Sequence, residues 1–188
     1  MPTIPELKVE RAVIGGLSMG GYAVFALLQS RPEIIAALIL ADTRASADSP
    51  EGRANRRNML ALVDREGPQG VAKEMMPKLL GNTTRETNQT AEATVRRLIK
   101  QQSPVAIRGA INRMMHRPDS TGLLATIGVP TLVIVGEEDT LTPVADSERM
   151  AQAIKGAKLV KIPAAGHLSS LEQPDPFNHA LSAFLAAL

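Results

Sequence analysis

The chain has 188 residues, of which 44% are hydrophobic and 21% are charged, with a formal net charge of +2 and no cysteine. This composition indicates one globular domain with a core of its own. It excludes disulfides, thiolate metal sites and a cysteine nucleophile, and it gives no reason to expect a nucleic-acid partner. No apolar run is long enough to span a membrane and the N-terminus does not resemble a signal peptide, so we expect a cytoplasmic protein with no membrane partner.

The first expected elements are a strand and a helix on either side of a glycine-rich turn. After a polar lead with a helical turn over residues 6–9, an apolar strand is predicted over 11–15 and a helix over 19–30. The uninterrupted apolar run 35–40 favours a strand buried on both faces of a parallel sheet.

A segment of different character follows, and we interpret residues 45–118 as a helical lid inserted into a body made of 1–44 and 119–188. Four helices are predicted there: 50–65, 69–80, 86–102 and 104–117. The lid is rich in arginine, lysine and methionine. These residues either attract carboxylate substrates and line an acyl pocket, or form solvated helix faces and fill the lid core, and we favour the second interpretation.

Alternation of strands and helices resumes after the lid. The pattern predicts a strand over 130–136, a helix over 144–155, a strand over 158–162 and a closing helix over 176–188. The fold class is therefore α/β, with a small and mostly parallel sheet.

The turn after the first strand has the spacing Gly16-x-Ser18-x-Gly20, which in a strand–turn–helix context is the nucleophile elbow. Ser18 is the candidate nucleophile. Small residues at Gly16 and Gly20 would let the strand and the helix approach closely. The start of the helix offers backbone N–H groups and a positive dipole end to a developing oxyanion.

An activated serine needs a histidine base, and the base needs an acid that orients it. Of three histidines, His167 follows the carboxyl end of a predicted strand, whereas His116 and His179 lie on predicted helices and are expected to be surface residues.

The acid is expected after the strand 130–136. Asp139 is favoured because it lies furthest from the strand end, and Glu137 or Glu138 is a minor alternative.

These motifs together resemble the α/β-hydrolase superfamily, and within it the carboxylesterases and 3-oxoadipate enol-lactonases. The resemblance rests on Gly16-Leu17-Ser18-Met19-Gly20-Gly21, Gly136-x-x-Asp139-x-x-x-Pro143, Ala165-Gly166-His167 and Leu40-Ala41-Asp42-Thr43-Arg44. It implies a serine hydrolase with no metal and no organic cofactor. Ser18 would be its nucleophile, His167 its base, Asp139 the orienting acid and Met19 an oxyanion donor.

The sequence also departs from the family pattern, because the elbow follows the first strand here and the fifth strand in the family. The four preceding strands and the loop that supplies a second oxyanion donor have no counterpart. We therefore expect an N-terminally truncated α/β-hydrolase fold in which Met1 lies inside the family's sequence. The elbow strand would expose an unpaired edge, which favours a homodimer formed through that edge.

The predicted function is hydrolysis of a small carboxylic ester through an acyl-enzyme. Enol-lactonase-like opening of a lactone and haloperoxidase-like perhydrolysis are alternatives from the same chemistry. A non-catalytic truncated relative that binds a ligand or a partner is the alternative from another class. Candidate substrate-binding residues are Leu17, Arg44, Met114 and Leu168, and Asp42 is expected near the rim of the pocket.

Overall fold

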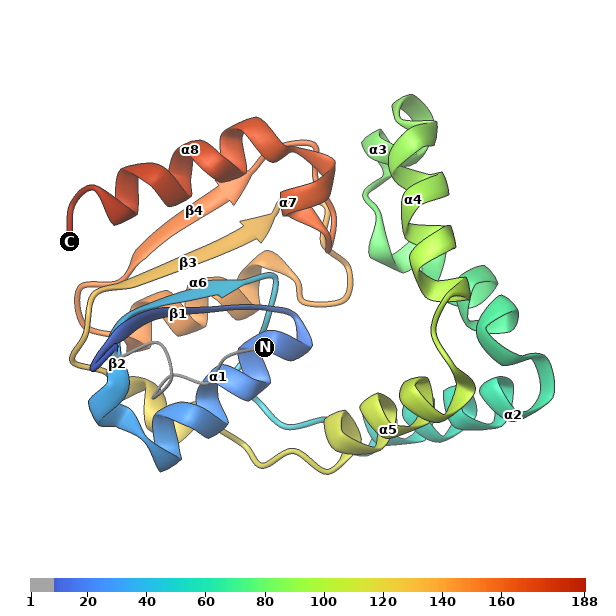
Figure 1. The fold of residues 1–188 in the computed structure, drawn as a ribbon, viewed down its shortest axis with the longest axis horizontal. Helices are drawn as coiled ribbons and strands as arrows, with labels where there is room; N and C mark the ends of the chain where they lie inside the picture. Colours follow the sequence, from blue (N-terminus) through green and yellow to red (C-terminus); the bar gives the residue numbers. More distant parts are fainter. Residues whose placement is uncertain (1–8) are drawn as a thin grey trace.

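The structure is a computed structural model, and it describes residues 9–188. Its centre is a sheet of four parallel strands in the order β1-β2-β3-β4, with helices on both faces (Figure 1). The strands are β1 (Ala12–Leu17), β2 (Ile35–Ala41), β3 (Thr131–Gly136) and β4 (Lys158–Ile162). Because all four strands run the same way, their carboxyl ends meet at one edge of the sheet, where open α/β sheets place their functional loops.

Two apolar layers hold helices to this sheet. Alternate residues of β2 point to opposite faces, so that Leu38 and Leu40 lie on one side and Ala37 and Ala41 on the other. The first side packs against α1 (Met19–Ser30) and α6 (Val144–Ala153), and the second against α8 (Pro174–Leu185). Burial on both faces explains the uninterrupted apolar run of β2. Three short helices also lie in the chain outside residues 50–115: η1 (Pro32–Ile34), η2 (Thr121–Thr126) and α7 (Ser169–Glu172).

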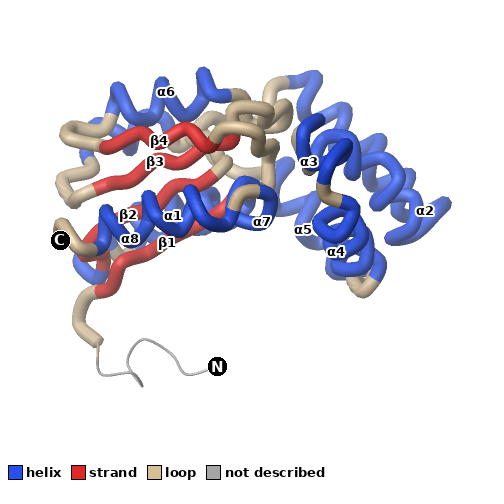
Figure 2. The backbone as a smooth tube through the Cα atoms, turned by 90° about the horizontal axis from the view of Figure 1, so that it is seen from above, coloured by secondary structure: helices blue, strands red, loops and turns tan. Residues whose placement is uncertain are grey.

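The segment between β2 and β3 forms a separate group of helices beside the carboxyl ends of the strands (Figures 1 and 2). These helices are α2 (Pro50–Leu79), α3 (Asn82–Thr87), α4 (Gln89–Lys100) and α5 (Pro104–Met115). Two apolar clusters join these helices, and the methionines 59, 75, 76 and 114 pack in them. These methionines therefore fill space between the helices, which is the interpretation that the sequence favoured.

The two ends of this helical group meet on the body. Arg117 forms a buried ion pair of 2.8 Å with Asp48, and its guanidinium carbon lies 4.2 Å from the centre of the Tyr22 ring on α1. Asp48 also pairs with Arg56 at 3.1 Å. Charge pairing and a cation–π contact therefore fasten the start and the end of the group to α1.

The helices between residues 50 and 102 differ from the prediction for local reasons. The predicted break at 66–68 is a kink inside α2, where Gly67 has φ 61° and ψ −157°. The predicted helix 86–102 crosses the boundary between α3, which already begins at Asn82, and α4. The side chain of Asn88 sets this boundary because it caps α4 by accepting a hydrogen bond of 3.0 Å from the backbone N–H of Ala91.

Strand β1 extends two residues beyond the predicted 11–15. Gly16 and Leu17 remain in it because they pair with Leu40 and Ala41 of β2, and this tertiary pairing overrides the low strand propensity of glycine. Within residues 9–188, β1 pairs on one side only, and its Val13 is 36% exposed. The predicted helical turn over 6–9 lies mostly outside the described residues.

Helices long and apolar enough to cross a membrane are absent from the described part of the chain.

Candidate active site

Ser18 occupies the sharp turn between β1 and α1. Its backbone has φ 53° and ψ −115°, a conformation that costs a non-glycine residue of the order of 1–3 kcal/mol. The surroundings hold it there: its N–H donates to the carbonyl of Ala41 (2.9 Å), and its carbonyl accepts from the N–H of Gly21 (3.0 Å). The Ser18 side chain is thus presented at the carboxyl edge of the sheet by a backbone that two hydrogen bonds hold in this conformation.

The close approach of strand and helix at this turn depends on Gly16 and Gly21. A Cβ on Gly16 would lie 2.3 Å from the carbonyl carbon of Gly20, and a Cβ on Gly21 would lie 2.4 Å from the Thr43 hydroxyl. Gly20 itself has no atom within 4 Å of such a position. The expectation that Gly20 permits the approach is therefore wrong, because the carbon that it lacks would point into open space.

His167 joins Ser18 to Asp139 through its two ring nitrogens. Nε2 lies 2.7 Å from Ser18 Oγ, and Nδ1 lies 2.8 Å from Asp139 Oδ2. A carboxylate only accepts hydrogen bonds, so Nδ1 carries the proton and Nε2 is free to accept from the serine hydroxyl. His167 is 3% exposed and Asp139 is 5% exposed. These three residues, which we call the triad, have the geometry in which a histidine can remove a proton from a serine.

Asp139 is held as an anion. Its Oδ1 accepts from the N–H groups of Leu141 (2.8 Å) and Thr142 (2.9 Å), and its Oδ2 accepts from the Thr142 hydroxyl (2.5 Å). Burial on its own would raise the pKa of Asp139, but the hydrogen bond and the charge of His167, followed by the bonds from Thr142, outweigh it and lower that pKa below its ordinary value. The carboxylate is therefore ionised at neutral pH.

The two glutamates that were alternatives for the acid have other positions. Glu137 is exposed. Glu138 accepts from the backbone N–H of Thr83 (2.9 Å) and from the Thr83 hydroxyl (2.5 Å). Asp139 is thus the carboxylate in this loop that is bonded to His167, while Glu138 ties the loop to the helical group.

A second carboxylate fastens the same corner of the helical group. Glu172, which is 4% exposed, accepts from the N–H of Gly81 (2.8 Å) and from the N–H of Leu168 (3.0 Å). Gly81 also packs so closely on Gly166 that a Cβ on it would lie 2.9 Å from the Gly166 nitrogen. The turn between α2 and α3 is therefore seated on the loops that carry Asp139 and His167. Sequence reasoning did not single out Glu172, and an acidic residue at the end of a short helix carries no signal that could have done so.

The remaining candidate site residues lie in different places. Met19 is the first residue of α1, where a backbone N–H has no acceptor within the helix, and its side chain is 44% exposed. Leu17 packs on the α8 side of the sheet. Leu168 packs against Met76, Leu80 and Val95 of the helical group.

Arg44 and Met114 are engaged with other parts of the protein. The guanidinium of Arg44 donates to the carbonyl of Leu141 and lies 3.3 Å from Asp146. Met114 packs between α2 and α5. A role in substrate binding stays a prediction for both residues.

Asp42 is not at the rim of a pocket. Its exposed fraction is 0%, and it lies beneath the triad loops at the carboxyl end of β2. The two other histidines are on the surface: His116 ends α5 with its ring 2.9 Å from the carbonyl of Asn112, and His179 is on α8.

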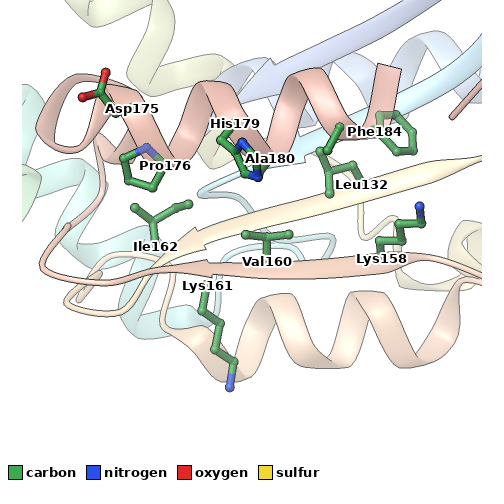
Figure 3. A pocket seen from close by; sticks show the side chains of 11 residues that line it. Leu132, Lys158, Val160, Lys161, Ile162, Asp175, Pro176, His179, Ala180 and Phe184 are labelled. Carbon is green, nitrogen blue, oxygen red and sulfur yellow. The ribbon is translucent and has the colours of Figure 1, made fainter. Parts of the chain in front are cut away.

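A hollow of about 720 Å³ lies elsewhere, between α8 and β4, and Figure 3 shows that its lining is mostly apolar. The lining includes Val160, Ile162, His179 and Phe184, and none of the three triad residues. The reacting groups and this hollow are therefore separate features.

A family model described as "alpha/beta hydrolase fold" matches residues 6–174, and the chain belongs to this family. The match confirms the predicted superfamily and fold. Membership of this family, with its esterase and enol-lactonase relatives, supports hydrolase activity.

Individual relatives carry several activities in their names. An esterase from Thermogutta terrifontis is 40% identical, with a TM-score of 0.93 over 98% of this chain and 68% of that chain. An enol-lactonase from Burkholderia xenovorans LB400 is 28% identical, with a TM-score of 0.87 over 97% of this chain and 68% of that one. The "Putative non-heme bromoperoxidase BpoC" of Mycobacterium tuberculosis is 27% identical over 98% of this chain and 72% of its own length. The chain thus spans about two thirds of the length of these relatives.

Proposed function

We propose that the chain is a serine hydrolase that cleaves a small carboxylic ester through an acyl-enzyme. The observation that carries this proposal is the continuous hydrogen-bonded chain from Ser18 Oγ through His167 to Asp139, with distances of 2.7 and 2.8 Å. The esterase relative at 40% identity supports the choice of an ester.

In the proposed reaction, His167 Nε2 takes the hydroxyl proton of Ser18 as Oγ attacks the ester carbonyl carbon. The negative charge that develops on the carbonyl oxygen is stabilised by the backbone N–H of Met19 and by the positive end of the α1 dipole. Asp139 stabilises the imidazolium that forms. His167 then gives the proton to the leaving alcohol, and the acyl group stays on Ser18.

Deacylation repeats these steps with water. His167 removes a proton from a water molecule, which attacks the acyl carbon, and the proton returns to Ser18 Oγ when the acid leaves. The same groups would open a lactone, in which the leaving alcohol remains part of the product. The enol-lactonase relative at 28% identity favours this second candidate.

Trapping of the acyl-enzyme tests the proposal. After brief mixing with p-nitrophenyl acetate, intact-mass spectrometry should show one added acetyl group, which peptide mapping should place on Ser18. A Ser30→Ala variant is the matched control, because Ser30 is an exposed serine at the far end of the same helix. Acylation elsewhere, or none in a folded protein, would contradict the proposal. Parallel assays with five-membered lactones and acyclic esters separate the two substrate classes.

A further inference from the structure

Asp42 and Thr43, at the carboxyl end of β2, reach every segment that carries a triad residue. Both residues are completely buried. Asp42 is one of the few non-glycine residues with a positive φ, at 44°. Its backbone N–H still donates to the carbonyl of Ile134 in β3 (2.9 Å). The chain therefore turns sharply just after the last backbone hydrogen bond between β2 and β3. Backbone strain and the burial of a carboxyl group both make the free energy of folding less favourable, which points to a role for Asp42 beyond filling space.

Thr43 contacts the elbow. Its hydroxyl donates to the carbonyl oxygen of Ser18 (2.8 Å), and its side chain packs against Gly21 so tightly that any Cβ on Gly21 would overlap it. The Ser18 carbonyl belongs to the peptide that leads into Met19, the candidate oxyanion donor. The hydrogen bond from Thr43 therefore helps to orient both Ser18 and the first backbone N–H of α1.

Asp42 contacts the two other loops. Its Oδ1 accepts from the N–H of Gly136, three residues before Asp139, and this bond continues the ladder between β2 and β3 past its last backbone pair (2.9 Å). Its Oδ2 accepts from the hydroxyl of Ser169, two residues after His167 (2.5 Å). One carboxyl group thus joins the acid loop to the histidine loop.

The charged and titratable groups that act on Asp42 are His167 and Asp139. The pKa of Asp42 is raised to about 7, chiefly by burial and further by the negative charge of Asp139. The hydrogen bonds from Ser169 and Gly136 and the charge of His167 act in the opposite direction and are outweighed. Below that pH a neutral carboxyl keeps both hydrogen bonds without placing a second negative charge beside Asp139.

We propose that Asp42 and Thr43 are positioning residues, which together set the relative placement of Ser18, Asp139 and His167 by hydrogen bonds to the three segments that carry them. The inference rests on the proposed serine hydrolase function and goes beyond it by assigning the support of the triad to one dipeptide. Triad geometry is sensitive to such support, because a displacement of about 1 Å can cost about 100-fold in rate.

Substitutions that delete each bond, paired with substitutions that keep it, test this role. Asp42→Ala removes both carboxyl bonds, whereas Asp42→Asn can still accept from Gly136 and donate to Ser169. Thr43→Val removes the hydroxyl at nearly constant volume, whereas Thr43→Ser keeps it. Asp175→Asn, at an exposed position on α8, is the control for loss of an acidic residue.

Two readouts are needed: kcat and KM for a p-nitrophenyl ester, and the rate at which a fluorophosphonate labels Ser18. We expect Asp42→Ala and Thr43→Val to lower kcat and the labelling rate by about 10- to 100-fold with KM within about threefold. Asp42→Asn at pH 6 and Thr43→Ser should stay within about threefold of the unaltered chain.

Equal kcat and labelling in all four variants would overturn the positioning role, as would equal losses in the paired variants. If Asp42→Ala does not fold, the Thr43 pair and Asp42→Asn decide the question by the same criteria. Failure of the unaltered, folded chain to be labelled at Ser18 would instead contradict the proposed function. The two failures are therefore distinguishable.

Discussion

Gly16→Ala should be far more damaging than Gly20→Ala, although both glycines belong to the same motif. A Cβ on Gly16 would lie 2.3 Å from both the carbonyl carbon and the carbonyl oxygen of Gly20 and 2.5 Å from the nitrogen of Gly21. All three are backbone atoms in the first turn of α1 and cannot rotate away. Since ordinary contact begins at 3.4 Å, strand and helix would have to separate by about 1 Å (3.4 minus 2.3).

We expect this separation to lower the free energy of unfolding by about 3 kcal/mol, the upper part of the range for overpacking. For a chain of this length that loss corresponds to a fall in Tm of roughly 6–12 °C. Because α1 begins directly after Ser18, the same movement should lower kcat/KM for a p-nitrophenyl ester by about 100-fold.

Gly20→Ala is the matched control. The added methyl group meets no atom within 4 Å, and alanine favours a helix, so Tm should be unchanged or slightly higher. Urea unfolding followed by circular dichroism measures both variants. A Gly16→Ala protein as stable as the unaltered chain, or equal losses in the two variants, would refute the claim that backbone contact at Gly16 shapes the turn.

Three further predictions follow from the site and the sheet edge. Asp139→Asn should lower kcat by about 10³–10⁴-fold by disturbing the orientation of His167. The exposed control Glu137→Gln should leave kcat unchanged. Similar losses in both variants would contradict the assignment of Asp139 as the acid that orients His167. Asp42 has a pKa of about 7 in the folded protein against an ordinary value of 3.8, so between these pH values the folded state keeps a proton that the unfolded chain releases. Stability relative to Asp42→Asn should thus fall by up to about 4 kcal/mol from pH 4 to pH 8 in urea titrations, and a difference independent of pH would contradict the buried titration. We also propose that two copies pair through β1. Light scattering should then give twice the chain mass of 20.0 kDa, and Val13→Lys should shift the protein to a monomer. A monomeric unaltered chain would exclude this pairing.

Much of the fold follows from local sequence signals, because the strands are short apolar runs and most helices begin at proline or at a capping residue. Strand β4 was predicted to the residue, and α1 was too. Asn88 shows where such reading falls short. The predicted helix began at 86, two residues before this cap, so it ran across the boundary between α3 and α4.

The candidate triad could be anticipated because the elbow motif and the order of the strands put Ser18, Asp139 and His167 at the same edge of the sheet. The support beneath it could not. Asp42 follows a strand and is charged, which favoured a position at the rim, whereas its burial depends on contacts with Gly136 and Ser169 that are far away in the sequence. The roles of Gly16 and Gly20 likewise depend on where an absent Cβ would point, which a motif does not specify.

The central claim is that Ser18 is a nucleophile activated by His167. Its most direct test is the hydrolysis of p-nitrophenyl acetate and butyrate by the purified chain, by Ser18→Ala and by the control Ser30→Ala. We expect Ser18→Ala to lower kcat/KM by at least about 10³-fold while Ser30→Ala keeps the full rate. Equal rates for the unaltered chain and a folded Ser18→Ala protein would contradict the account.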